Sequence, residues 1–382
     1  MACIAPFIPY WDPATSGAAP PPGPISTSAG GNLVVSNAPE ILGGQTVVLL
    51  PNAGSLYKCV IPLSAGVSAP VRVFLWHVSH LDDGVVFDLR LSLSAAATGT
   101  AQSIRSSTRN VAETSDISVP GICLADIQLY RGFDDSAPDA TLGSNESVVW
   151  TATVDNGRLI GALIEFDVRA TTVCNLQLRT TFLMPGSTLP PWADDAVDEH
   201  DPPDNHGVRH VHVRGWWPRT AILMPVTTVL DLNPWGTAGS VECPIEEVTN
   251  PPELSAAGFQ WQGQTADPFG FDNKGLYGAD VSYEFGVTNT DPISSHAAYL
   301  RIFPRNSGGQ YWGAGKIAMP MGYPDQRIPK LNYASSSTGD FTPGNPGQPI
   351  PVIVPPNTTV PIAIRVANAV GGGQRYPSTS SS

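Results

Sequence analysis

Apolar and polar residues alternate with a period of two in several stretches of the chain. In residues 85–93 the apolar positions on one face are Phe87, Leu89, Leu91 and Leu93. Residues 174–183 and 208–214 show the same alternation. This period is typical of a β-strand with one buried face. Amphipathic helical patterns are nearly absent, and residues 125–129 also favour a strand, so the pattern predicts an all-β protein.

Turn residues separate the predicted strands. Asn156-Gly157 lies between the apolar runs 148–155 and 158–169, and Asn-Gly supplies the positive φ that a type I′ turn needs. Asp82-Asp83-Gly84 follows the apolar run 71–78 in a similar way. We therefore predict a β-hairpin at each of these two turns.

The first half of the chain divides into an arm and a folded domain. Residues 1–31 are rich in proline, which excludes both helix and central strand. Residues 32–185 contain about eight predicted strands with turn signals between them, as in a β-sandwich or jelly roll. Residues 186–207 are acidic and broken by proline, and we interpret them as a linker in solvent.

The second half predicts another β domain. Residues 208–370 contain further strand patterns, separated by long Gly- and Pro-rich loops at 233–278 and 304–350. Residues 371–382 form a flexible tail by composition. The predicted fold is thus all-β, with two β-sandwich, jelly-roll-like domains.

Charge narrows the choice of partners. The net charge is −13, and residues 191–207 carry six acidic and no basic groups. Clustered Lys and Arg are absent, so we expect no direct binding of nucleic acid. No apolar stretch reaches membrane-spanning length and no secretory signal begins the chain, so we expect synthesis in a cytosol and no membrane contact. The five cysteines include no Cys-x-x-Cys pair, which favours free buried thiols and leaves a disulfide between strands open.

Two small clusters of polar residues are the candidates for chemistry. His210 and His212 lie two apart on a predicted strand, so they share a face and are a workable pair for a transition metal. The alternative is a polar strand face beside the acidic linker. Glu165 and Asp167 lie two apart on one strand face, a spacing that could suit the carboxylate pair of a glycosidase. The alternative is that they belong to a solvated face on which charges are paired. Since no nucleophile or phosphate-loop motif occurs, we expect a protein without catalysis or cofactor.

Aromatic residues are the most suggestive binding candidates. Six of the nine tryptophans follow residue 190, several of them near Gln, Asn and Gly. Such rings either fill the ends of a sandwich core or contact a protein or sugar. The candidate binding residues are Trp216, Trp217, Phe259, Trp261, Tyr311 and Trp312. In the arm, Phe7, Tyr10 and Trp11 predict docking on the chain's own domain or on a neighbouring subunit.

The whole pattern resembles coat and surface-decoration proteins of non-enveloped viruses. The points of likeness are the Pro-rich arm, about eight strands with Gly/Pro loops, a second predicted sandwich and a Ser-rich end. Unlike many genome-packaging coat proteins, the arm has no Lys or Arg. The resemblance therefore implies an outer-surface, crown, spike or minor capsid component on the virion surface. Its partners would be other copies of itself, a capsid shell protein, or a host receptor or glycan during attachment.

Two functions follow from these features. The first is a non-catalytic structural protein of a virus particle that assembles through its arm and long loops. The alternative is a carbohydrate- or receptor-binding β-sandwich protein that uses the loop aromatic residues.

Overall fold

The structure, a computed structural model, describes two long parts of the chain and several short ones. The long parts are residues 52–192, without 83, 95 and 114–117, and residues 277–300. The shorter parts are residues 8–9, 16–17, 31–37, 41–43, 214–218, 220–225, 230–231, 240–241, 312–318, 326–332, 346–347 and 350–369.

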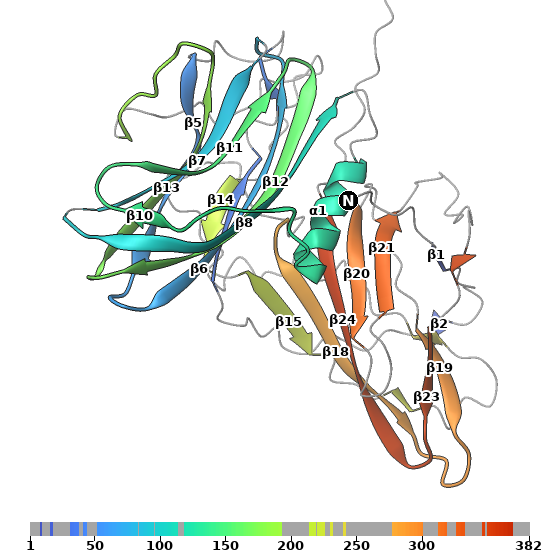
Figure 1. Cartoon of the computed structure of the whole chain (residues 1–382). Coiled ribbons are helices and arrows are strands. Elements are labelled where there is room, and N and C mark those ends of the chain that lie inside the picture. The colour runs from blue at the N-terminus through green and yellow to red at the C-terminus, as the bar shows by residue number, and fades with distance from the viewer. Residues whose placement is uncertain are drawn as a thin grey trace, which may run out of the picture.

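Two sheets face each other in a sandwich, shown at the left of Figure 1. The larger sheet has the order β10-β8-β12-β6-β3-β14, with β4 pairing with β6 and β9 with β8. Its strands are β3 (Asn32–Ser36), β4 (Ile41–Leu42), β6 (Ser68–Ser79), β8 (Gly99–Ala112), β9 (Asp135–Ser136), β10 (Ala140–Leu142), β12 (Arg158–Ala170) and β14 (Arg214–Trp217). The smaller sheet has the order β11-β7-β13-β5 and consists of β5 (Ala53–Leu63), β7 (Val85–Leu93), β11 (Ser147–Val154) and β13 (Cys174–Leu183).

A further sheet follows in the second half of the chain. It has the order β15-β18-β24-β20-β21, with β16 pairing with β18. Its strands are β15 (Ala221–Pro225), β16 (Leu230–Asp231), β18 (Asp280–Asn289), β20 (Trp312–Ala318), β21 (Gln326–Asn332) and β24 (Thr358–Ala369). Three two-stranded pairs complete the described strands: β19 (His296–Leu300) with β23 (Ile350–Val354), β1 (Ile8–Pro9) with β22 (Pro346–Gly347), and β2 (Ser16–Gly17) with β17 (Ser240–Val241).

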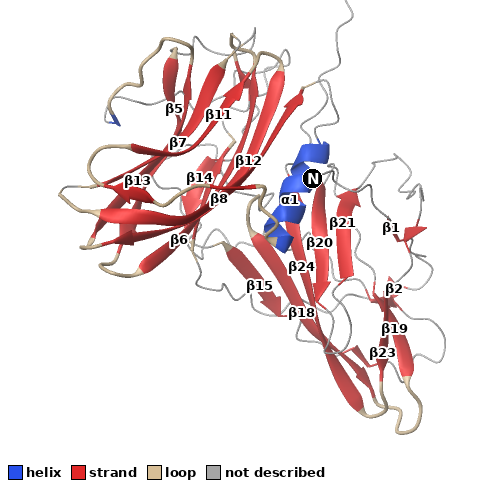
Figure 2. Cartoon of the chain, in the orientation of Figure 1, coloured by secondary structure: helices blue, strands red, loops and turns tan. Residues whose placement is uncertain are grey.

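The described residues are mostly in strands, as Figure 2 shows, which agrees with the all-β prediction in its coarse form. The predicted strand at 174–183 coincides with β13 and that at 85–93 with β7. Between the two sheets, Phe87, Leu89 and Leu91 of β7 are fully buried, as their alternation predicts.

Both predicted hairpins are wrong in their pairing. β11 pairs with β7 in the smaller sheet, whereas β12 pairs with β6 and β8 in the larger sheet. Gly157 does have a positive φ of 71°, but its N–H donates to the Ser79 carbonyl at 2.7 Å. Gly84, with φ of 81°, likewise stands between β6 and β7, which belong to different sheets. Each turn therefore carries the chain from one sheet to the other. The apolar core lies between the two sheets, so successive strands cover it from opposite sides.

The larger sheet is buried on its outer face as well as on its inner face. In β6, Phe74 and Trp76 point away from the sandwich core and are 2% and 0% exposed. Phe74 stacks on Trp76 and on Tyr277, both with ring centroids 6.4 Å apart. Gly278 lies so close that a Cβ there would meet Leu33 at 2.8 Å, and its φ is 74°. The outer face is thus covered by the segment that leads into β18.

The one helix among the described elements, α1 (Ser118–Tyr130), also covers this face. It contacts β8 and β12 of the larger sheet on one side and β20, β21 and β24 on the other, and Figure 1 shows it between the two. The strand predicted at 125–129 is therefore wrong. A helix packed on two sides is apolar around its circumference and lacks the 3.6-residue stripe of a surface helix.

The predicted loop 304–350 is also wrong in part, since it contains β20 and β21. β20 has the sequence WGAGKIA, whose small residues hide the alternation of a strand. Among the cysteines, Cys123 of α1 is disulfide-bonded, whereas Cys59 and Cys174 are free. In the part of the chain described, no helix has the length and apolar character needed to cross a membrane.

Candidate functional site

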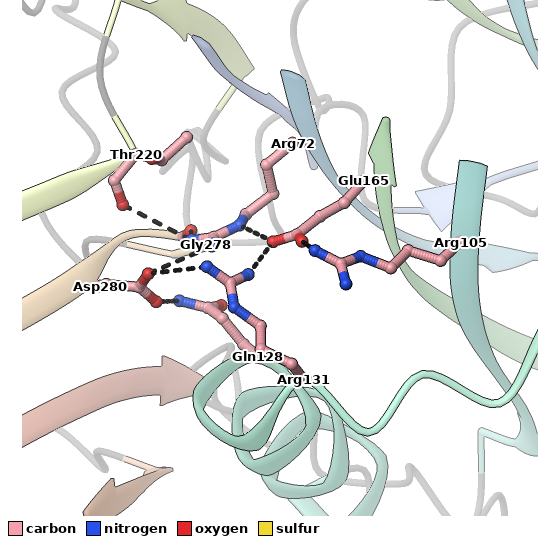
Figure 3. A network of polar contacts seen from close by, with 8 residues as sticks. All are labelled: Arg72, Arg105, Gln128, Arg131, Glu165, Thr220, Gly278 and Asp280. Carbon is pink, nitrogen blue, oxygen red and sulfur yellow. Dashed lines mark hydrogen bonds and ion pairs between the residues drawn. The ribbon is translucent and has the colours of Figure 1, made fainter. Parts of the chain in front are cut away.

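A network of charged side chains lies where the sandwich, α1 and the sheet of the second half meet (Figure 3). Arg72 of β6, Arg105 of β8 and Glu165 of β12 come from the larger sheet of the sandwich. Gln128 lies in the last turn of α1 and Arg131 directly follows the helix, while Gly278 lies two residues before Asp280, the first residue of β18. We call these seven residues the junction network.

Arg72 is the centre of the junction network. Its Nε donates to Glu165 Oε1 at 2.7 Å, and its Nη2 donates to Asp280 Oδ2 at 3.1 Å. Its Nη1 donates to the Gly278 carbonyl at 2.7 Å. The Arg72 side chain is 3% exposed. Burial alone would lower the pKa of Arg72, but the charges of Asp280 and Glu165 outweigh burial and raise it above its ordinary value. Arg72 therefore stays charged and joins the sandwich to β18.

Glu165 accepts from three arginines. Its Oε1 accepts hydrogen bonds from Arg72 and Arg131, and its Oε2 accepts one from Arg105 Nη2 at 3.0 Å. The Glu165 side chain is 10% exposed. Glu165 is thus charge-paired, as one of the two sequence interpretations expects, but it is buried rather than solvated. Because both oxygens are engaged by guanidinium groups, this carboxylate fixes the positions of neighbouring elements.

Two residues at the end of α1 bind the second carboxylate of the network, that of Asp280. Gln128 Nε2 donates to Asp280 Oδ1 at 2.8 Å, and Arg131 Nη2 lies 3.6 Å from Asp280 Oδ2. Arg131 follows the last residue of α1 and has a φ of 57°, a left-handed conformation common after a helix end but unusual for a residue with a side chain. In this conformation the Arg131 side chain contacts the carboxylates of Glu165 and Asp280. The end of α1 is therefore bound to β12 and to β18 through one residue.

Some members of the junction network leave a signal in the sequence. Arg72 interrupts the apolar run 71–78, and a charge in such a run indicates a buried partner. The identity of that partner carries no sequence signal, since Asp280 is 208 residues away.

Trp216 and Trp217 lie in the interior of the protein. They belong to β14, which pairs with β3 at the edge of the larger sheet. Their exposed fractions are 5% and 2%, and Trp216 Nε1 donates to Asn32 Oδ1 at 3.0 Å. The first strand described after the predicted linker therefore belongs to the larger sheet of the sandwich, and these two rings contact the chain's own core.

The other predicted site residues are mostly outside the described part of the chain. Trp312 is the first residue of β20, where its backbone pairs with Asn332 and Ala369. The predicted residues that lie outside the described residues are Phe7, Tyr10, Trp11, His210, His212, Phe259, Trp261 and Tyr311. Within the described residues, no group of three or more His, Cys, Asp or Glu side chains is placed to hold a metal ion.

A second polar cluster lies inside the sandwich. Ser36 Oγ is 3.1 Å from His77 Nε2 and 2.8 Å from Thr180 Oγ1. All three residues have no exposed surface. Because Ser36 and His77 belong to the larger sheet and Thr180 to the smaller, this cluster is a polar link across an otherwise apolar core.

Comparison with known proteins gives little support to any assignment. No family model and no curated protein matches the chain. Among solved structures, a laccase mutant from B. aclada shows 14% identity and a TM-score of 0.13, over 79% of this chain and 47% of the laccase. The STIV major capsid protein shows 10% identity and a TM-score of 0.12, over 82% of this chain and 96% of that protein. At these scores neither structure supports an assignment of fold or function.

Proposed function

We propose that this chain is a non-catalytic structural protein of a virus particle, an outer-surface or minor capsid component. The observation that carries the proposal is the junction network. Ion pairs and hydrogen bonds of the junction network join α1 and the start of β18 to the outer face of the sandwich, and we infer that these elements act as one building block of set shape. A building block with a set shape is what repeated assembly requires, because its binding surfaces keep their relative positions.

The strand order supports a jelly-roll-like sandwich within this proposal. Along the chain, β5, β6, β7 and β8 alternate between the two sheets, and β11, β12 and β13 do so again. Double-sheet jelly rolls, which occur in viral capsid domains, are wound from strands that cross between sheets in this way. The Pro-rich arm without Lys or Arg adds support for an outer-surface component. Its partners would be copies of itself and a capsid shell protein, and it would act on the virion surface after synthesis in a host cytoplasm.

The native assembly state tests the proposal. We expect the purified chain to form multimers over a range of concentrations, seen by mass photometry and negative-stain electron microscopy, or to sediment with particles from its source. The Arg109→Met variant, which loses a partly exposed ion pair with Asp134 and a hydrogen bond to the neighbouring Thr108 carbonyl, is a control that should assemble as the wild type does. A strict monomer at every concentration, with no particle in native material, would overturn the proposal.

A further inference from the structure

Three basic residues occupy one row across the sheet of the second half. Lys316 of β20 pairs in register with Arg365 of β24 on one side and with Arg327 of β21 on the other. Figure 1 shows these three strands side by side. Residues directly opposite each other in antiparallel strands share a face of the sheet, so the three form a line of positive charge about 10 Å long. We call this line the basic row.

The basic row is unfavourable for the sheet itself, because like charges directly opposite each other in a sheet are destabilising. Arg365 is exposed, and it makes no hydrogen bond or ion pair with any residue that the structure describes. Its register partner in β18 is the neutral Ser282. At Arg365 the basic row therefore offers a positive charge that the described part of the chain leaves unpaired.

Two carboxylates lie on the same face of β18, one on each side of Ser282. Asp280 already binds Arg72 and Gln128 of the junction network. Glu284 pairs in register with Ala363 rather than with a residue of the basic row. One remaining carboxylate does not balance three cations, so the row keeps a net positive charge.

The opposite charge is concentrated in residues 191–207, which carry six acidic and no basic groups. We call these residues the acidic segment. Its acidic residues are Asp194, Asp195, Asp198, Glu199, Asp201 and Asp204. Before them, the Trp192 carbonyl accepts from Lys58 Nζ of β5 at 2.8 Å, and after them Arg214 begins β14 beside β3. The sandwich thus holds the chain on both sides of these carboxylates, whereas the basic row belongs to the other sheet.

From these observations we propose that the basic row binds the acidic segment of a second copy of this chain. Copies that each carry a net charge of −13 repel one another, so a contact between them is favourable only where opposite charges meet. The same repulsion acts against an acidic polymer from outside. The inference rests on the proposed function, since it names the contact through which such a structural protein assembles.

The proposed contact joins two different surfaces, so every copy can use its basic row and its acidic segment at once. Contacts of this head-to-tail kind build closed rings or filaments. Exposed ion pairs contribute only about 0–1 kcal/mol each, so a single contact is weak. Salt screens such pairs, and we therefore expect self-association of the wild type to weaken as the salt concentration rises.

Arg365→Glu tests the inference, with Arg169→Glu as the matched control. Arg169 of β12 is also exposed, but its register partners Ser68 and Thr100 are neutral. By sedimentation velocity at low salt, we expect Arg365→Glu to weaken self-association about tenfold, because attraction becomes repulsion. Arg169→Glu should associate as the wild type does. Circular dichroism of both variants checks that they fold.

A mixing experiment distinguishes contact between copies from contact within one chain. A second variant replaces the six acidic residues of the acidic segment by Asn or Gln and keeps the basic row. The Arg365→Glu variant has the opposite defect, since it keeps the acidic segment. We expect each variant alone to associate weakly and a mixture of the two to form heterodimers. A mixture that associates no better than its components would overturn the inference.

The remaining outcomes separate the inference from the proposed function. If the wild type assembles and Arg365→Glu assembles as well as Arg169→Glu, the inference fails and the proposed function stands. If the wild type binds heparin through Arg365 while its self-association does not depend on this residue, the basic row serves an outside polyanion and the inference also fails. A wild type that is monomeric at every concentration contradicts both.

Discussion

At the scale of single residues, Arg72 is the position where one substitution should do most damage. Its side chain is 3% exposed and binds both Glu165 and Asp280. Arg72→Met removes the cation but leaves two partly buried carboxylates without their central partner. Breaking a buried pair in this way costs roughly 3–5 kcal/mol. Urea denaturation followed by tryptophan fluorescence should show a loss of unfolding free energy of this size.

The control for this prediction is Arg109→Met. Arg109 binds Asp134 at 2.7 Å with side-chain exposures of 19% and 27%. An ion pair of this kind contributes about 0–1 kcal/mol. Equal losses for the two variants would show that Arg72 is no more important than a surface arginine.

We expect protonation of Asp291 to lower the free energy of unfolding, and to do so only in acid. Its carboxylate accepts backbone N–H groups of Ser294 and Ile293 and a bond from His296, which together lower its pKa to about 2. The unfolded value is about 3.9, so the folded state binds this proton less readily. The stabilisation is therefore present above about pH 4 and is lost as the pH falls through about 2. Carbon-13 NMR of the Asp291 carboxyl group should give a midpoint near 2, and a midpoint near 4 would contradict these hydrogen bonds.

Residue-scale features that depend on period were predictable from the sequence. Phe87, Leu89 and Leu91 alternate in the sequence and are buried in the core. The partners of Glu165 were not predictable, because Arg72, Arg105 and Arg131 come from three elements that only the tertiary fold brings together. For Trp216 and Trp217 the sequence leaves a core position and a binding position open, because an aromatic residue suits both, and their burial in β14 decides for the core.

At the scale of elements, the contact of α1 with β12 can be tested at Gly161. A Cβ at this position would meet Trp76 ring carbons at 2.8 Å and Leu124 of α1 at 3.1 Å. Gly161→Ala therefore forces Trp76 and the helix to shift, and overpacking of this kind costs about 1–3 kcal/mol. We expect a lower urea midpoint for this variant, with an unchanged dependence of unfolding free energy on urea.

Gly143→Ala is the matched substitution. No atom lies within 4 Å of a Cβ built at Gly143, so we expect little change in the urea midpoint. If Gly161→Ala proved as stable as Gly143→Ala, the close packing of α1 on β12 would be wrong.

Strand positions were predicted better than strand partners. The sequence around Asn156-Gly157 does form a turn with a positive φ, because Asn and Gly determine the local backbone. Which strands then pair is decided by burial across the whole sandwich, and this sends β11 and β12 to different sheets. The helix α1 was missed for a related reason, since burial on two sides removes the amphipathic pattern on which sequence analysis depends.

At the scale of the whole molecule, the sequence predicts a β-rich chain but not how its halves meet. Residues 71–78 and 158–169 read as nearly continuous apolar runs, a pattern typical of strands covered on both faces. The structure gives the reason, because α1 and the segment before β18 cover the outer face of β6 and β12. The first half of the chain therefore should not form an independent soluble domain.

A chain that ends at Trp192 tests this dependence. It keeps β5 to β13 and α1 but lacks β14, which pairs at the edge of the larger sheet, and β20 and β24, which pack against α1. Tyr277 would no longer stack on Phe74, and Arg72 would lose Asp280 and the Gly278 carbonyl. We expect this shortened chain to bind the dye ANS and to aggregate, because a large apolar face becomes exposed to water. A monomer that unfolds cooperatively and binds no dye would show that the sandwich is stable alone, and that the junction network joins two independent domains rather than completing one core.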